Sequence, residues 1–190
     1  MLGIILPDAT SLPGNASYVQ QEFRYWSNQQ AETLPTCRVQ PNCPRDVAAS
    51  LVVARYFECQ FAVKSGGHAA FAGASNIQGG LTIDLANMNQ VQVSKDRTLT
   101  QVGAGTHWVD VYSQLDPLGL SVVGGRVAAI GVGGLTLGGR YRSHEHIQRK
   151  QTLTFFKVAY RSSLAVTVGL ATALETTKYV KIRRTSQWTG

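Results

Sequence analysis

The 190-residue sequence lacks the features that mark several common protein classes. Although 44% of its residues are hydrophobic, no apolar run is long enough to span a membrane. The N-terminus lacks a basic segment followed by a long apolar one, so no signal peptide is predicted and the localisation stays open. Its three cysteines, Cys37, Cys43 and Cys59, fit no zinc-ligand spacing, and their disulfide pairing also stays open. We expect no membrane association and no metal site.

Charged residues are few, at 15% of the sequence, and they are unevenly distributed. Residues 1–139 hold 8 Lys/Arg and 9 Asp/Glu, whereas residues 140–190 hold 10 Lys/Arg and 2 Asp/Glu. The net charge of +7 therefore belongs to the C-terminal segment. A nucleic-acid-binding protein usually carries its basic residues on a folded surface. We therefore expect no nucleic-acid partner, with binding by the basic segment as the alternative.

The pattern of apolar residues predicts a mixture of helices and strands. Residues 1–36 are polar and rich in turn formers. A helix is predicted to start at Cys43-Pro44-Arg45-Asp46, because proline and an acidic residue favour the first turn. Thr106 is the predicted cap of a second helix that ends before Pro117 and Gly119. Strands are predicted at residues 60–64, 81–85, 91–93, 99–102 and 120–123.

Two glycine-rich segments about sixty residues apart are the candidates for a ligand site. The first is Lys64-Ser65-Gly66-Gly67-His68, and the second runs from Gly131 to Gly139. Glycine lets a backbone approach a ligand closely, and successive turn N–H groups can bind a phosphate. The second segment has neither the lysine of a Walker loop nor the surrounding strands of a Rossmann fingerprint. The segments could form two walls around one phosphate-containing ligand, or two turns that pack on each other.

Taken together, five segments resemble the FAD-binding domain of the vanillyl-alcohol-oxidase, or p-cresol-methylhydroxylase (PCMH), flavoproteins. The branch with the strongest resemblance is the berberine-bridge-enzyme-like oxidoreductases of fungi. In chain order the segments are Leu34-Pro35-Thr36-Cys37-Arg38-Val39, Phe61 to His68, Gly80 to Leu85, Val102 to Trp108 and Gly131 to Gly139. Each segment alone is unspecific, but their order over roughly residues 20–139 is highly specific.

The resemblance implies an α+β domain of two subdomains, with the pyrophosphate of FAD held between them. It assigns cofactor contacts to two sets of residues: Lys64, Ser65, Gly66, Gly67 and His68 on one side, and Gly131, Val132, Gly133, Gly134 and Gly138 on the other. In many members the histidine at the position of His68 bonds covalently to the flavin 8α-methyl group. A neutral imidazole nitrogen aimed at an electrophilic carbon suits that bond. A histidine that only hydrogen-bonds to the cofactor is the alternative.

Some members of the family form a second covalent bond, through a cysteine just before the second glycine-rich segment. That position is Val127 in this sequence, which has no thiol. We therefore expect at most a single covalent link. His107 is a weaker candidate, because a surface or capping role at a helix start is its simpler interpretation.

After Gly139 the sequence departs from the family, which continues with a segment similar to Ile-Ser-Phe-Phe-Ser-Gly-Arg-Tyr-Gly-Trp. The sequence instead continues Arg140-Tyr141-Arg142-Ser143. In a shifted reading frame, each codon consists of the third base of one original codon and the first two bases of the next. With permitted wobble bases, the codons of residues 158–179 read in that frame encode the missing family segment. We hypothesise that residues from about 140 to 157 translate a retained intron and that the following exon is read out of frame.

These observations predict an FAD-dependent oxidoreductase that is present as a partial chain. Residues 1–30 are predicted as an N-terminal extension, 31–139 as the N-terminal part of the FAD-binding domain, and 140–190 as an aberrant basic tail. An intact relative would transfer hydride from a small-molecule substrate to the flavin, which oxygen or another acceptor reoxidises. We expect the chain itself to be inactive, and no catalytic base is assigned. A non-catalytic fragment or binding module is the alternative.

Overall fold

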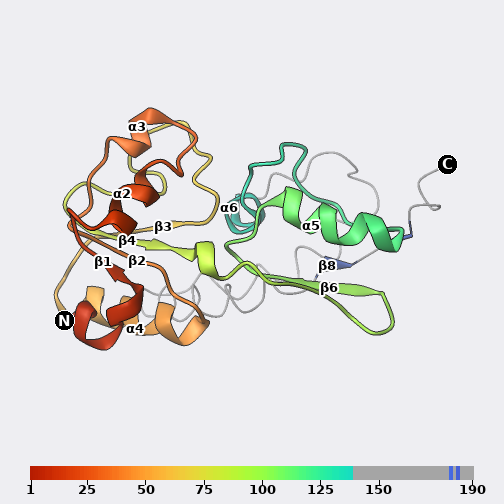
Figure 1. The fold of residues 1–190 in the computed structure, drawn as a ribbon, viewed down its shortest axis with the longest axis horizontal. Coiled ribbons are helices and arrows are strands. Elements are labelled where there is room, and N and C mark those ends of the chain that lie inside the picture. Colours follow the sequence, from red (N-terminus) through yellow and green to blue (C-terminus); the bar gives the residue numbers. More distant parts are fainter. Residues whose placement is uncertain (139–179, 182, 185–190) are drawn as a thin grey trace.

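The computed structural model describes residues 1–138 and two short strands at residues 180–181 and 183–184 (Figure 1). The predicted basic tail, apart from those strands, and the proposed change of reading frame therefore lie outside the described residues, as does Gly139. No helix within the described residues is long and apolar enough to cross a membrane. The described chain forms two units with separate apolar cores, the first built on one sheet and the second on two.

The first unit is built on a four-stranded sheet in the order β1-β2-β4-β3. Strands β2 and β3 both run parallel to β4, while β1 is antiparallel to β2. The strands are β1 (Thr10–Ser11), β2 (Cys37–Val39), β3 (Phe61–Lys64) and β4 (Leu81–Asp84). The helices are α1 (Leu2–Ile5), α2 (Ala16–Glu22), α3 (Asn28–Ala31) and α4 (Pro44–Tyr56), with 3-10 turns η1 (Pro7–Ala9) and η2 (Leu85–Asn87).

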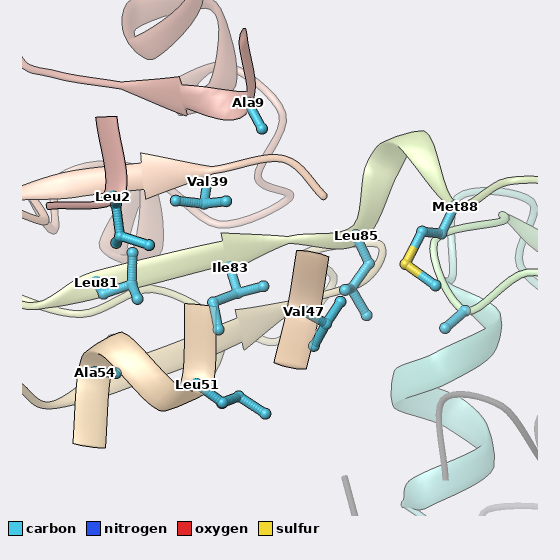
Figure 2. Packing of buried hydrophobic residues seen from close by; sticks show 11 residues of the cluster. Leu2, Ala9, Val39, Val47, Leu51, Ala54, Leu81, Ile83, Leu85 and Met88 are labelled. Carbon is cyan, nitrogen blue, oxygen red and sulfur yellow. The ribbon is translucent and has the colours of Figure 1, made fainter. Parts of the chain in front are cut away.

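Helix α4 covers one face of this sheet, and the sequence explains where the helix begins. Cys43 is its N-cap, Pro44 occupies the first turn, and the Asp46 carboxylate accepts a hydrogen bond from the Cys43 backbone N–H at 3.3 Å. Its buried residues Val47, Leu51 and Ala54 pack against the alternating apolar side chains of β2 and β4, as Figure 2 shows. The predicted start of this helix is confirmed.

The opposite face of the sheet is polar, because side chains alternate along each strand. It carries the buried residues Arg38, Lys64, Thr82 and Asp84. Helices α2 and α3 and the loop at 69–79 lie on this side of the sheet, across from α4 (Figure 1). The N-terminal 36 residues, predicted only as polar and turn-rich, thus supply a strand and three helices to the unit. Leu2 and Ala9 join the apolar core, and tertiary hydrogen bonds of Tyr18 and Gln30 hold α2 and α3.

The second unit contains a hairpin, two helices and the short C-terminal strands. Its elements are β5 (Val91–Val93), β6 (Leu99–Val102), α5 (Trp108–Leu115), η3 (Asp116–Leu118), β7 (Leu120–Ser121), α6 (Val132–Leu137), β8 (Val180–Lys181) and β9 (Arg183–Arg184). Strand β8 pairs with β6, and β9 pairs with β7, both antiparallel. The core of this unit comprises Val102, Trp108, Val111, Leu115, Leu120, Val122 and Val132.

Most of the predicted elements of this unit are confirmed, with two corrections. Helix α5 is capped by His107 instead of Thr106, because Thr106 is fully buried before the helix begins. The strand predicted over residues 120–123 is confined to Leu120–Ser121. Two units with separate cores confirm the predicted α+β class of two subdomains.

Candidate functional site

The two glycine-rich segments meet directly, backbone against backbone. A Cβ added at Gly66 would lie less than 3.0 Å from the backbone of Gly131, and one added at Gly131 would lie less than 3.0 Å from Gly66. The Ser65 hydroxyl donates to the Ala104 carbonyl at 2.6 Å, which ties the first segment to the second unit. The approach is possible only without side chains at both glycines. Of the two interpretations left open by the sequence, packing of the segments on each other is therefore present.

The same two segments also line one cavity of about 730 Å³. Such a volume suits a small-molecule ligand. Its lining residues from the first segment are Ser65, Gly66, Gly67 and His68, and those from the second are Gly131, Gly133, Gly134, Leu135, Leu137 and Gly138. A neighbouring cavity of about 470 Å³ shares Ser65, Gly66 and His68 and adds Lys64 and His107. The two interpretations are thus compatible, since the segments pack on each other and together enclose a space.

The backbone at Gly67 and His68 is free to bind an anion. Gly67 has a φ of +65°, a left-handed conformation that disfavours any residue with a Cβ. Within the described residues neither Gly67 nor His68 donates a backbone hydrogen bond to protein. A turn with free N–H groups beside a cavity is an arrangement that binds phosphate. These residues fit the pyrophosphate of a dinucleotide cofactor such as FAD.

A buried ion pair lies directly beneath this turn. The Lys64 ammonium and the Asp84 carboxylate are 3.0 Å apart, with side chains only 3% and 0% exposed. Both residues end parallel strands at the same edge of the sheet, where their Cα positions are paired in register. Because its charge is neutralised here, the Lys64 side chain anchors the turn, and the cofactor contact that the resemblance predicts for the Lys64 backbone stays a prediction.

A second cation, Arg38, lies nearby on the same polar face and is fully buried. Its guanidinium lies 4.7 Å from the ring centroid of Tyr18 and donates a 3.2 Å hydrogen bond to the Tyr25 hydroxyl. Its Nε and Nη2 atoms have no hydrogen-bond partner within the described part of the chain. Burial raises the pKa of Tyr25 well above its ordinary value, against the opposing charge of Arg38. The layer beneath the turn therefore carries a net positive charge, which favours an anionic ligand.

His68 closes the first segment at the junction of the two cavities. Its imidazole is half-buried, and it stacks on the indole of Trp26 with ring centroids 5.0 Å apart and planes inclined by 17°. The backbone N–H of Trp26 donates to the Gly67 carbonyl at 3.1 Å. A partly exposed imidazole beside a ligand-sized space can act as a nucleophile toward a bound molecule.

The residues of the second glycine-rich segment do not all line the larger cavity. Gly133, Gly134 and Gly138 line the larger cavity, whereas Val132 lines neither of these cavities and is fully buried in the second core. The Val132 N–H donates to the Thr106 carbonyl at 2.8 Å. A Cβ at Gly134 would meet no atom within 4 Å, so this residue faces open space. The structure thus gathers nine of the ten predicted site residues around the cavities and places Val132 behind them.

His107 and Val127, the other two residues that the sequence singled out, lie outside the larger cavity. His107 lines the smaller cavity, and its Nδ1 atom is 3.8 Å from a carboxylate oxygen of Asp110, with both side chains substantially exposed. It makes no capping hydrogen bond although it is the N-cap of α5. Val127 is 49% exposed. Val127 carries no thiol, and the His107 imidazole borders the smaller cavity but not the larger one.

Sequence reasoning missed four residues that shape the site: Tyr25, Trp26, Asp84 and Arg38. Tyr25 and Trp26 stand in a segment with no regular apolar pattern, so nothing local placed them at the cavity. Asp84 carried the only usable signal, because a carboxylate that ends an apolar strand tends to lie at the sheet edge used for ligands. Arg38 alternates with apolar neighbours in β2, which marks the opposite face but not its burial.

Sequence comparison agrees with this geometry. The family of FAD binding domains matches residues 35–167, well over half of the chain and beyond Gly139. The FAD-dependent monooxygenase tpcD of Cochliobolus heterostrophus is 45% identical over 115 residues, which are 60% of this chain and 22% of that protein. The FAD-dependent monooxygenase prx3 of Penicillium roqueforti is 39% identical over 134 residues, 70% of this chain and 26% of that protein. The chain thus spans about a quarter of the length of these relatives.

Comparison of structures supports the same fold. The 6-hydroxy-D-nicotine oxidase of Arthrobacter nicotinovorans superposes with a TM-score of 0.59 at 22% identity, covering 65% of this chain and 27% of the oxidase. A berberine-bridge-enzyme-like protein of Physcomitrella patens, variant D396N, gives 0.61 at 21% identity, covering 72% of this chain and 30% of the other. The chain belongs to the PCMH-type FAD-binding domain family, and FAD is its cofactor.

Proposed function

We propose that this chain is the cofactor-binding part of an FAD-dependent oxidoreductase that acts on a small molecule. The observation that carries the proposal is the contact between Gly66 and Gly131, which brings both glycine-rich segments and His68 to one cavity. The relatives tpcD and prx3 are both named FAD-dependent monooxygenases, which supports an oxidoreductase. Flavin accepts a hydride from a substrate carbon and passes its electrons to an acceptor.

Within this proposal each part of the site has one role. The backbone of Ser65 to His68 binds the pyrophosphate, and the net positive layer beneath it, which contains Arg38, favours that charge. The ion pair of Lys64 with Asp84 fixes the turn without offering its charge to the ligand. Gly133 and Gly134 leave space on the opposite wall. Val132 supports that wall from the second core.

We further propose that His68 bonds to the flavin 8α carbon. An imidazole nitrogen of His68 and the methyl group each lose one hydrogen as the bond forms, and both protons and two electrons pass to the flavin ring. Dioxygen then reoxidises the ring and is reduced to hydrogen peroxide, which balances the step. Because Val127 carries no thiol, one such bond forms.

Expression of the full chain with FAD tests both parts. We expect a yellow protein whose flavin stays in the pellet after acid precipitation. His68→Ala should release the flavin into the acid supernatant, whereas His107→Ala, at the edge of the smaller cavity, should retain it. A colourless wild-type chain would contradict FAD binding and favour the non-catalytic alternative. Flavin that His68→Ala still holds after acid treatment would contradict the covalent role of His68.

A further inference from the structure

Trp26 is a large aromatic side chain that the core does not use. Its side chain is 63% exposed, and it belongs to neither apolar core. It lies instead against His68 and borders both cavities. An indole left in solvent gains little from burial, so its position calls for another explanation. The contact with His68 provides one.

Hydrogen bonds connect the segment that carries Trp26 to Gly67 and to the loop that follows His68. The Trp26 N–H donates to the Gly67 carbonyl at 3.1 Å, and the Ser27 hydroxyl donates to the Ala70 carbonyl at 2.7 Å. The Gln30 amide donates to the Ala69 carbonyl at 2.6 Å. Hydrogen bonds thus hold residues 26–30 along residues 67–70.

Gln30 extends this attachment further along the loop. Its side chain is fully buried, and its carbonyl oxygen accepts hydrogen bonds from the Ser75 N–H at 2.9 Å and the Ser75 hydroxyl at 2.7 Å. The Asn76 amide donates to the Gln30 backbone carbonyl at 2.7 Å. These bonds fix the backbone that carries Trp26 beside the loop that carries His68.

We infer that Trp26 is a positioning residue for His68, an inference that rests on the proposed covalent role of that histidine. An imidazole attached to a glycine-rich turn has two side-chain torsions to rotate about. The near-parallel indole at 5.0 Å restricts rotation of the imidazole ring, and both rings border the two cavities. Holding a nucleophile in a reactive orientation raises the rate of bond formation without changing ligand affinity.

The test compares Trp26→Ala with Trp26→Phe and with Phe23→Ala in the full chain. Phe23 is a matched control, because it is a still more exposed aromatic from the same segment that borders neither cavity. We expect Trp26→Ala to slow the appearance of acid-stable flavin about tenfold or more, as lost orientation would. Trp26→Phe keeps a ring for stacking and should stay within a few-fold of wild type. Phe23→Ala should match wild type.

A second measurement separates positioning from binding. In a His68→Ala background, which cannot form the bond, Trp26→Ala should bind FAD with a Kd within about twofold of its parent. Attachment at the wild-type rate in Trp26→Ala would overturn the inference. A loss of FAD affinity as large as the loss of attachment rate would also overturn it, because Trp26 would then be a binding residue.

A third measurement needs no flavin. The ring current of a stacked indole shifts imidazole proton resonances upfield, so in histidine-labelled protein the His68 resonances should move downfield in Trp26→Ala. Unchanged His68 resonances would contradict the stacking itself. If wild-type chain acquires no acid-stable flavin, the proposed covalent function fails, and the resonance shift still decides whether Trp26 holds the ring.

Discussion

Single residues at the junction of the two glycine-rich segments determine whether a cofactor site can exist. Gly66 and Gly131 approach each other closely because neither has a Cβ. Gly67 adopts a left-handed conformation, and the ion pair of Lys64 and Asp84 holds the strand end below it. These features serve different purposes, since the first joins the units, the second shapes the turn and the third anchors it. Substitutions should therefore have separable effects.

Gly66→Ala tests the close approach. The added Cβ would lie less than 3.0 Å from the Gly131 backbone, so we expect the free energy of unfolding to fall by about 1–3 kcal/mol, as in overpacked sites. Gly134→Ala is the matched control, because its Cβ would meet nothing within 4 Å and it lies inside α6. We expect it to stabilise the chain by about 0.5–1 kcal/mol. Urea unfolding without FAD measures both, and equal effects would contradict the contact.

The half-buried phenol of Tyr25 should make the free energy of unfolding fall at alkaline pH. Its pKa is raised above the ordinary 10.0 by burial, so above pH 10 the unfolded chain loses a proton that the folded chain keeps. The contribution of Tyr25 to the free energy of unfolding is therefore fully present below pH 10. Above pH 10 the free energy of unfolding falls by up to about 1.4 kcal/mol per pH unit. Tyr25→Phe should flatten this slope, whereas the control Tyr56→Phe, at an exposed side chain, should not. Parallel slopes in wild type and Tyr25→Phe would contradict the assignment.

At the scale of elements, the predictable part of the fold is the part with strong local patterns. Helix α4 has a proline start and an acidic first turn, and strands β3 to β6 alternate or end in turn residues, so the sequence predicted them well. Residues 1–36 escaped prediction, because α2 and α3 are short and depend on long-range hydrogen bonds. In the site, the glycines carried their own signal, whereas Trp26 became visible only through its contact with His68.

Gln30→Ala tests the attachment of α3 to the loop at 69–76. Its loss removes the bonds to Ala69 and Ser75 and leaves buried polar groups without partners, at a cost of about 1–3 kcal/mol. Amide hydrogen exchange should accelerate in residues 69–76 more than in α4. Gln29→Ala, at an exposed neighbour, is the control and should change neither quantity. Uniform acceleration throughout the chain would contradict a local attachment.

At the scale of the whole molecule, the two units share one boundary with two neighbouring cavities along it. Each unit buries its own core, and the larger cavity lies where the two glycine-rich segments meet. The chain spans 22% and 26% of the two fungal relatives described above, so we propose that substrate contacts and the catalytic base belong to parts of the family outside this stretch. The family match extends to residue 167, beyond Gly139, so the origin of the sequence after Gly139 needs its own test.

The transcript itself tests the proposed change of reading frame. We expect the codons for residues 158–179 to carry the wobble bases that spell the family segment in the shifted frame. Genomic sequence across codons 135–190 should show splice-site signals flanking codons 140–157. Wobble bases that spell any other segment would contradict the hypothesis.

The most direct test of the central claim, flavin attachment through His68, is the mass of the peptide that contains it. The full chain is expressed with FAD, denatured, digested and measured by mass spectrometry. We predict that the His68 peptide gains the mass of FAD less two hydrogen atoms and that the peptide containing His107 gains no such mass. An unmodified His68 peptide from protein that held FAD until denaturation would contradict covalent attachment, and protein that never held FAD would contradict the site as a whole.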